Sequence, residues 1–179
     1  MTSASPLHVP PDPTEYAPYY GRYVSLVPAG DVLAQLQEQL NEATAILADI
    51  PESKAGCRYG PDKWSIREVM GHVIDAERVF GYRSLCFSRG DAAPLPSFEQ
   101  DDYAKASAET LATTPLANLA TEFQTLRQSH ILMFRRLAPD DWLRKGTASG
   151  NLVSVRAMAH VMAGHVRHHM TVLQERYLS

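Results

Sequence analysis

Apolar residues recur at helical spacing in four long segments of the 179-residue chain. An apolar residue at every third or fourth position forms one continuous stripe along a helix, so each segment is predicted to be an amphipathic helix. The four segments are residues 31–50, 65–89, 114–138 and 154–178. No stretch has a convincing strand pattern. The apolar pattern therefore predicts an all-α protein.

Local signals support the predicted helix boundaries. Ser65 followed by Glu68 forms a capping box, and Gly90 ends the second apolar stripe. Thr114-Pro115 gives a cap followed by proline at the first helical position, where the missing N–H costs nothing. Pro139 then breaks the third helix.

The connection from Asp91 to Thr113 is long for a loop within a helical bundle. A short helix is expected within it, around Ser97–Ala106. Asp101 and Asp102 fall in this connection and are interpreted as loop residues that are solvated or capping. A connection of this length allows a crossover, so the sequence predicts a four-helix bundle with a crossover connection.

Residues 1–30 are predicted to form an extended N-terminal arm, followed by the bundle over residues 31–179. Prolines at this density prevent a helix. The prolines of the arm are Pro6, Pro10, Pro11, Pro13, Pro18 and Pro28. The arm also carries Tyr16, Tyr19, Tyr20 and Tyr23. Their rings are expected to pack on the protein body or on another subunit.

Composition and charge exclude several classes of function. The net charge is −3 and there is no basic run, so a nucleic acid partner is not expected. No apolar stretch approaches the roughly 18–20 residues that span a membrane, and no secretory signal is present. Cys57 and Cys86 do not form a disulfide framework. These features indicate a soluble, reduced, cytoplasmic protein.

Four of the seven histidines lie in the stretch Met158–Tyr177 of the last predicted helix. His165 and His169 are separated by four residues, which places both imidazoles on one helix face, within reach of a single metal ion. Both lie near the middle of the apolar face. His160 is expected to project nearly opposite and His168 to one side, so both are predicted to be surface residues.

A third candidate ligand, His72, lies at the edge of the apolar stripe on the second helix. Three neutral imidazoles would leave a divalent ion with open coordination positions, as in a catalytic site. The alternative for His165 and His169 is a pair of core histidines that are hydrogen-bonded to side chains or water. For His72 the alternative is a boundary residue with one nitrogen in solvent.

Two further polar residues fall on the inward faces of the helices. Glu77 could orient a ligand histidine or act as a base, or it could form a buried ion pair with an arginine, which is the commoner case. His130 on the third helix could be a reserve ligand, a donor lining a pocket, or a satisfied core histidine.

Two sequence motifs resemble signatures of the DinB/YfiT-like superfamily of metal-dependent proteins. Trp64-Ser65-Ile66-Arg67-Glu68 with Gly71-His72 is similar to its second-helix motif. Ala163-Gly164-His165-Val166-Arg167-His168-His169 is similar to the histidine motif of its last helix. The resemblance extends over roughly residues 31–178.

The resemblance implies a four-helix bundle that binds a divalent metal, often nickel or zinc, through His72, His165 and His169. It also implies a homodimer. Members of the superfamily include thiol S-transferases that use bacillithiol and a mycothiol-dependent maleylpyruvate isomerase domain. The three histidines by themselves suit zinc, nickel, iron and copper alike.

Three functions are consistent with these features. The first is a metal-dependent transferase that joins a low-molecular-weight thiol cosubstrate to an electrophilic small molecule. The second is a hydrolase in which water replaces the thiol. The third is a non-catalytic, metal-containing binding module in a stress response. A fourth protein ligand such as His130 would favour the module, whereas an open position at the base of a pocket would favour an enzyme.

Overall fold

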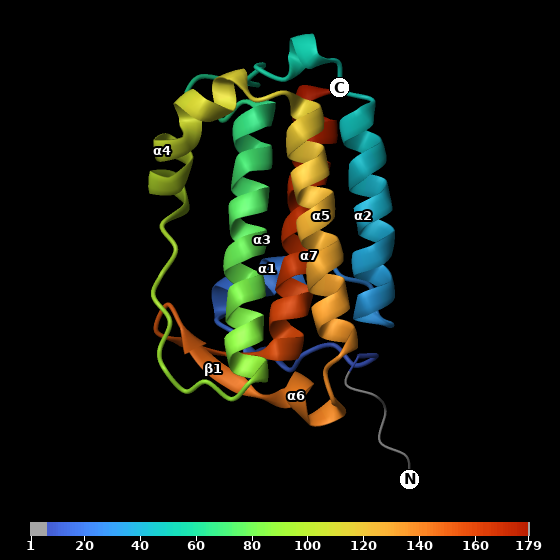
Figure 1. Ribbon diagram of the computed structural model, residues 1–179, viewed down its shortest axis with the longest axis vertical. Helices are drawn as coiled ribbons and strands as arrows, with labels where there is room; N and C mark the ends of the chain where they lie inside the picture. The colour runs from blue at the N-terminus through green and yellow to red at the C-terminus, as the bar shows by residue number, and fades with distance from the viewer. Residues whose placement is uncertain (1–6, 179) are drawn as a thin grey trace.

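Four long helices form the body of the computed structural model, which describes residues 7–178 (Figure 1). They are α2 (Val32–Ala48), α3 (Ile66–Ser88), α5 (Leu116–Arg135) and α7 (Val155–Val172). Helices α2 and α7 run in one direction, and α3 and α5 run in the other (Figure 1). Helices α3 and α2 each pack against both α5 and α7. The predicted four-helix bundle is confirmed.

The helix caps form where the sequence predicts them. Ser65 Oγ accepts a hydrogen bond from the Glu68 N–H at 3.3 Å, and the Glu68 carboxylate accepts one from the Ser65 N–H at 2.6 Å. Asp31 caps α2 by accepting a bond from the Leu33 N–H. These contacts satisfy donors that a helix N-terminus would otherwise leave without partners.

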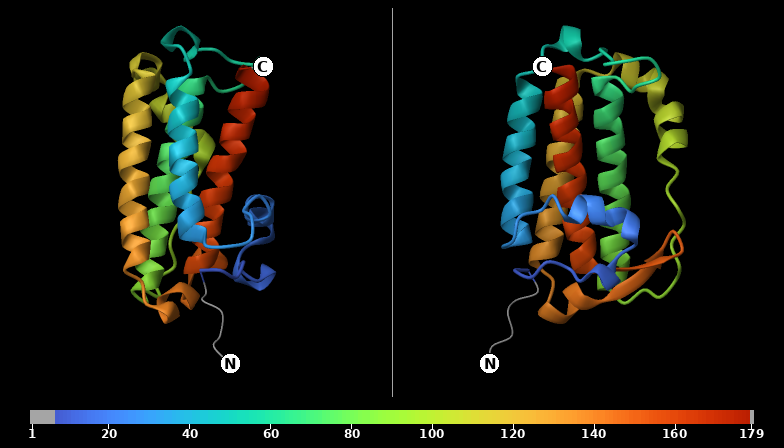
Figure 2. Two further views of the ribbon diagram at one scale, coloured as in Figure 1. Left: turned by 90° about the vertical axis from the view of Figure 1, so that its right-hand side faces the viewer. Right: turned by 180° about the vertical axis from the view of Figure 1, so that it is seen from behind.

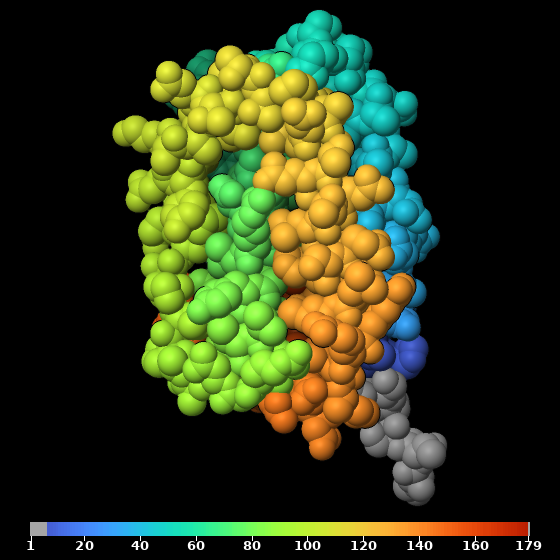
Figure 3. Space-filling model, viewed as in Figure 1, coloured from blue at the N-terminus to red at the C-terminus, as the bar shows by residue number. Residues whose placement is uncertain are grey.

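The crossover connection returns the chain along the outside of α3. It contains α4 (Gln100–Thr113), which is longer and starts later than the predicted short helix. The crossover returns the chain to the end of the bundle where α3 starts, and α5 begins there. Helices α3 and α5 therefore run in the same direction (Figures 1 and 3). Asp101 and Asp102 lie in the first turn of α4, so their interpretation as loop residues is wrong. Their negative charges suit the positive end of the helix dipole.

A two-stranded antiparallel hairpin links α6 (Pro139–Leu143) to α7, in a region where the sequence shows no strand pattern. The strands are β1 (Lys145–Ala148) and β2 (Asn151–Ser154). Ser149 and Gly150 form the turn with φ angles of 52° and 73°. Two consecutive positive φ angles are typical of a tight hairpin turn. Leu95 of the crossover pairs with Ala148, which fixes the crossover to this hairpin.

The N-terminal arm contains short helical turns, which differs from the expectation that its prolines prevent a helix. The turns are Pro13–Glu15, Pro18–Tyr20 and α1 (Gly21–Val24). Each of the first two begins on a proline, and the first position of a helix needs no N–H. The arm lies across α7 (Figure 2). Glu15 holds it there by accepting bonds from Ser154 and Arg156.

A buried polar layer separates two apolar clusters inside the bundle. One cluster fills the end near the hairpin, and the other fills the end near α4. Each of the four long helices contributes to the layer between them, and its members are Gln39, Glu77, Arg127 and His165. No helix within residues 7–178 is long and apolar enough to cross a membrane.

Gly164 allows the arm to reach α7, and its replacement by alanine should displace the arm. A Cβ at this position would lie 1.9 Å from the Tyr23 backbone oxygen, which is a severe clash. We expect Gly164→Ala to lower the free energy of unfolding by about 1–3 kcal/mol. Trypsin should also cleave the variant faster after the exposed Arg22. Urea unfolding and timed proteolysis measure these effects.

Gly56→Ala is the matched control, because a Cβ there would meet only an ordinary contact at 3.5 Å. Equal cleavage rates in the two variants would show that the close approach at Gly164 does not hold the arm.

Candidate functional site

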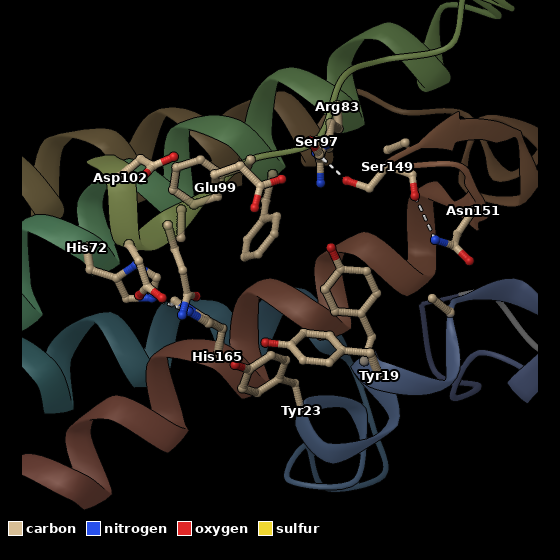
Figure 4. Close-up of a pocket in the computed structure, with 18 residues that line it drawn as sticks. Tyr19, Tyr23, His72, Arg83, Ser97, Glu99, Asp102, Ser149, Asn151 and His165 are labelled. Atoms are coloured by element: carbon tan, nitrogen blue, oxygen red, sulfur yellow. Dashed lines mark hydrogen bonds between the residues drawn. The ribbon is translucent and has the colours of Figure 1, made fainter. Parts of the chain in front are cut away.

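Three histidines from two antiparallel helices converge at one point in the bundle. His72 lies near the start of α3, and His165 and His169 lie one turn apart on α7. The Nε2 atom of His165 is 3.0 Å from that of His72 and 3.2 Å from that of His169. Figure 4 shows the side chains of His72 and His165 pointing toward each other. The structure thus brings together the three histidines that the sequence singled out.

The spacing of these nitrogens fits a shared metal ion. Two nitrogens that are each about 2.0–2.1 Å from one ion lie roughly 2.9 Å apart in octahedral geometry and roughly 3.4 Å apart in tetrahedral geometry. The observed separations of 3.0 and 3.2 Å fall in this range. The three ligand atoms all lie within 4.8 Å of one another, and no further histidine, cysteine or carboxylate among residues 7–178 joins the group.

The site keeps its imidazoles neutral. Burial lowers the pKa of His72 to about 4 and that of His169 to about 3. Burial, with the neighbouring histidines, also holds the pKa of His165 well below its usual range. A neutral imidazole offers a lone pair without first losing a proton, so protons compete weakly for these nitrogens at neutral pH.

The metal-free protein should lose stability as the pH falls. The pKa of His72 is 6.5 when unfolded and about 4 when folded, so between these values only the unfolded chain takes up a proton. Stability is therefore complete above about pH 6.5 and declines toward about pH 4. At about pH 5 the loss from His72 alone is about 2 kcal/mol. Urea unfolding of chelator-treated protein at several pH values measures it.

The His72→Gln variant provides the comparison for this titration. It should show a shallower fall in stability over the same pH range, because glutamine does not titrate. Parallel curves for the two proteins would contradict the assignment of the pH dependence to His72.

Aromatic rings surround the histidines. The His72 ring lies 4.9 Å from Trp64 and is stacked on Phe98 at 6.4 Å, measured between ring centroids. Phe80 and Tyr23 meet His165 edge-on at 5.6 and 5.2 Å. Nδ1 of His72 is buried and has no hydrogen-bond partner within the described part of the chain. Ring packing thus positions His72, whereas ligand histidines usually donate their second nitrogen to an oxygen.

Two open cavities reach the histidines from different sides. The larger has a volume of about 590 Å³, and His72 and His165 line it together with residues from the arm, the crossover and the hairpin (Figure 4). The smaller, of about 310 Å³, is lined by His169 and Trp64. Asp101 lines both cavities. The larger cavity has the volume of a small-molecule site.

The other two histidines of α7 differ in solvent exposure. His168 is exposed, as predicted. The prediction that His160 is a surface residue is wrong, because only 2% of its surface is exposed. Its Nδ1 forms a hydrogen bond with the Arg156 carbonyl, and the negative charge of Glu15, in the arm, acts on its pKa. The arm packs against α7 outside the bundle, and a helical wheel that considers only the bundle interior cannot include that contact.

Glu77 of the polar layer and its half-buried neighbour His130 make no bond to the three histidines among the contacts of residues 7–178. The Glu77 carboxylate accepts two bonds from the Arg127 guanidinium, at 2.7 and 2.8 Å. His130 Nδ1 lies 3.1 Å from the same carboxylate. The buried ion pair, the commoner alternative for Glu77, is therefore correct. Burial raises the pKa of Glu77, but Arg127 and His130 outweigh it and hold this pKa low.

The sequence analysis did not identify several residues of the site. Tyr23, Phe98 and Asp101 come from segments outside the four long helices, where no periodicity signals an inward side chain. The sequence does contain a signal for Arg83. It follows His72 by eleven residues, which is three helical turns. That spacing places both residues on the same face of α3.

Solved structures with this fold include proteins of known or described activity. YfiT from Bacillus subtilis, described as a probable metal-dependent hydrolase with an unusual four-helix bundle topology, is similar with a TM-score of 0.65. The two share 16% identity over 93% of this chain and 91% of YfiT. A mycothiol-dependent maleylpyruvate isomerase has a TM-score of 0.65 and 13% identity over 78% of this chain, which matches 58% of the isomerase. At these identities the likeness establishes the fold.

The family is established by the sequence. None of the curated proteins matches this chain. The family model of the DinB superfamily, however, matches residues 35–173, which include all three histidines of the site and all four bundle helices in large part. This chain therefore belongs to the DinB superfamily.

Proposed function

We propose that this protein is a metal-dependent transferase in which His72, His165 and His169 hold a divalent ion. The reaction would join a low-molecular-weight thiol to an electrophilic small molecule. One observation carries the proposal: three neutral imidazoles meet at one point, two of them line an open cavity, and no fourth protein ligand joins them within residues 7–178. Nickel, zinc and iron are the candidate ions.

The ion would lower the pKa of the thiol, so that the thiolate nucleophile forms at neutral pH. The protein contributes the setting for this chemistry. Burial keeps the three histidines neutral, and the rings of Phe80, Phe98 and Tyr20 give the larger cavity apolar walls for an electrophile. Such walls reduce the access of water, which would compete with the thiol.

The site geometry argues against a purely structural metal. A structural ion is normally enclosed by four protein ligands. His130, the reserve ligand considered from the sequence, bonds to Glu77 instead. Cavities reach the three histidines from two sides, which gives a small molecule access to them. These features support an enzyme over a non-catalytic binding module.

A metal-dependent hydrolase is the second candidate. It would use the same histidines and the same cavity, with water in place of the thiol. The likeness to YfiT, which is described as a probable metal-dependent hydrolase, favours this alternative. The likeness to a mycothiol-dependent isomerase favours a thiol-dependent reaction.

The deciding experiment uses protein purified without a histidine tag. Its metal content is measured first, and turnover is then followed with bacillithiol and 1-chloro-2,4-dinitrobenzene, and separately with an activated ester and no thiol. The transferase proposal expects turnover that requires the thiol, and the hydrolase proposal expects ester cleavage without it. Full activity in the His165→Ala, His169→Ala double variant would refute metal catalysis of either kind.

We also propose that the protein is a homodimer, as its superfamily resemblance implies, and that it is cytoplasmic, as the sequence features indicate. Sedimentation of the purified protein at several concentrations tests the assembly. A single monomeric species across the concentration range would refute the dimer.

A further inference from the structure

Arg83 is a buried cation without an acidic partner. Only 3% of its surface is exposed, and it lines the larger cavity. The ion pairs found within residues 7–178 involve other arginines and do not include Arg83. Buried arginines are normally paired with a carboxylate, as Arg127 is with Glu77. Arg83 therefore has a charge that the described chain leaves unbalanced.

The guanidinium of Arg83 is fixed at one nitrogen and has donors left at the others. Nη2 donates to the Pro96 carbonyl at 2.8 Å and to Ser149 Oγ at 3.1 Å. The hydrogen bonds of the described residues include none from Nε or Nη1. Neither atom is fully buried without a hydrogen bond. Arg83 lines the larger cavity, so its side chain forms part of the cavity wall (Figure 4).

The surrounding structure holds the guanidinium in place. Ser149 lies in the hairpin turn, and Pro96 follows Leu95, whose N–H and carbonyl bond to Thr147 and Ser149. The two acceptors of Arg83 are thus tied to each other by the backbone. A guanidinium fixed through one nitrogen can present its remaining donors to a planar carboxylate.

Arg83 lies well apart from His72 and His165 across the larger cavity (Figure 4). Eleven residues of helix separate Arg83 from His72, which is roughly 16 Å along α3. The aromatic rings of Phe80 and Phe98 line the same cavity. A ligand that fits has an anionic group at one end and an apolar or aromatic part beyond it.

Glu99 is one of three acidic residues that could compete for Arg83. It lines the same cavity, as do Asp101 and Asp102, and is exposed. It does not form an ion pair with Arg83 in the described structure. Its negative charge should weaken the binding of an anion in this cavity.

We propose that Arg83 binds the carboxylate of a small molecule whose apolar part lies along Phe80 and Phe98. That the end away from the carboxylate is the reacting end rests on the proposed function. The carboxylate site itself does not, because it depends only on Arg83 and its neighbours. It defines a substrate class: apolar or aromatic carboxylic acids.

The test compares 4-phenylbutyrate with the uncharged 4-phenylbutyramide by isothermal titration calorimetry. The carboxylate should bind at least about tenfold more tightly than the amide, as expected for hydrogen bonds to a charged group. Arg83→Gln should abolish the preference, and Glu99→Gln should strengthen carboxylate binding. Arg78→Gln is the matched control, because Arg78 is an exposed arginine on the same helix and pairs with Glu122. It should leave the preference intact.

The titration is repeated after chelation of any metal. A preference that disappears on chelation would show that the ion binds the carboxylate, and this would overturn the proposal. Equal affinities for acid and amide would also overturn it, as would a preference that survives Arg83→Gln. If Arg83→Gln does not fold, Arg83→Lys replaces it and should reduce the preference while keeping the charge. If the parent protein prefers the carboxylate over the amide but shows no metal-dependent turnover, only the proposed function is refuted.

Discussion

Replacement of His165 by alanine should abolish the proposed binding of a divalent ion. Its Nε2 lies 3.0 Å from that of His72 and 3.2 Å from that of His169, so it is the central member of the group. Without it, two nitrogens on different helices remain, and no other ligand lies close enough among the described residues to replace it. Removal of a residue that merely supports a ligand costs about 10–100-fold in metal affinity. Removal of the central ligand should cost at least about 100-fold.

Metal content by mass spectrometry, followed by titration with a competing chelator, measures this loss. The expected result is about one ion per chain in the parent protein, as three ligands around one point imply, and almost none in the variant. His168→Ala is the matched control, because His168 lies on the same helix but is exposed. It should retain the ion. Full metal content in His165→Ala would refute the assignment of the site.

The sequence was sufficient to predict the bundle and the histidines that converge within it. Apolar periodicity identifies the buried face of α7, and that face contains His165 and His169. The capping box at Ser65 fixes where α3 begins and therefore where His72 lies along it. These features are local, so a pattern in one segment is enough to reveal them.

What the sequence could not show depends on contacts between distant segments. His160 is buried, and the charge of Glu15, in the arm and more than a hundred residues away in sequence, acts on its pKa; the apolar pattern of α7 does not reveal this neighbour. The hairpin has only four residue pairs, too few for a visible alternation. The partner of Glu77 could be named only as an arginine, because the choice of Arg127 depends on how α3 and α5 pack.

The second large effect is expected at this buried ion pair. Arg127 is fully buried and Glu77 is 1% exposed, so Arg127→Met leaves a carboxylate in the core without its guanidinium. Breaking a buried pair by removal of one partner costs about 3–5 kcal/mol. Gln39 also loses the bond that it accepts from Arg127 at 2.9 Å. The free energy of unfolding, measured in urea, should fall by about this amount.

The double variant Glu77→Leu, Arg127→Met separates loss of the pair from loss of packing. Because it leaves no buried charge, it should be more stable than Arg127→Met alone. The matched control is Arg78→Met, which breaks the exposed pair with Glu122 and should cost less than about 1 kcal/mol. A double variant no more stable than Arg127→Met would show that the cost lies elsewhere.

The polar layer also bears on the metal site. Gln39 donates to the Ala163 carbonyl at 2.6 Å, two residues before His165. Arg127 holds Gln39 in place and lies 3.5 Å from the Met162 carbonyl. Arg127→Met should therefore weaken metal binding as well as folding, while Arg78→Met should leave metal binding unchanged and lower stability by less than about 1 kcal/mol. Metal affinity equal to that of the parent, measured at a temperature where Arg127→Met is folded, would show that α7 positions His165 without this layer.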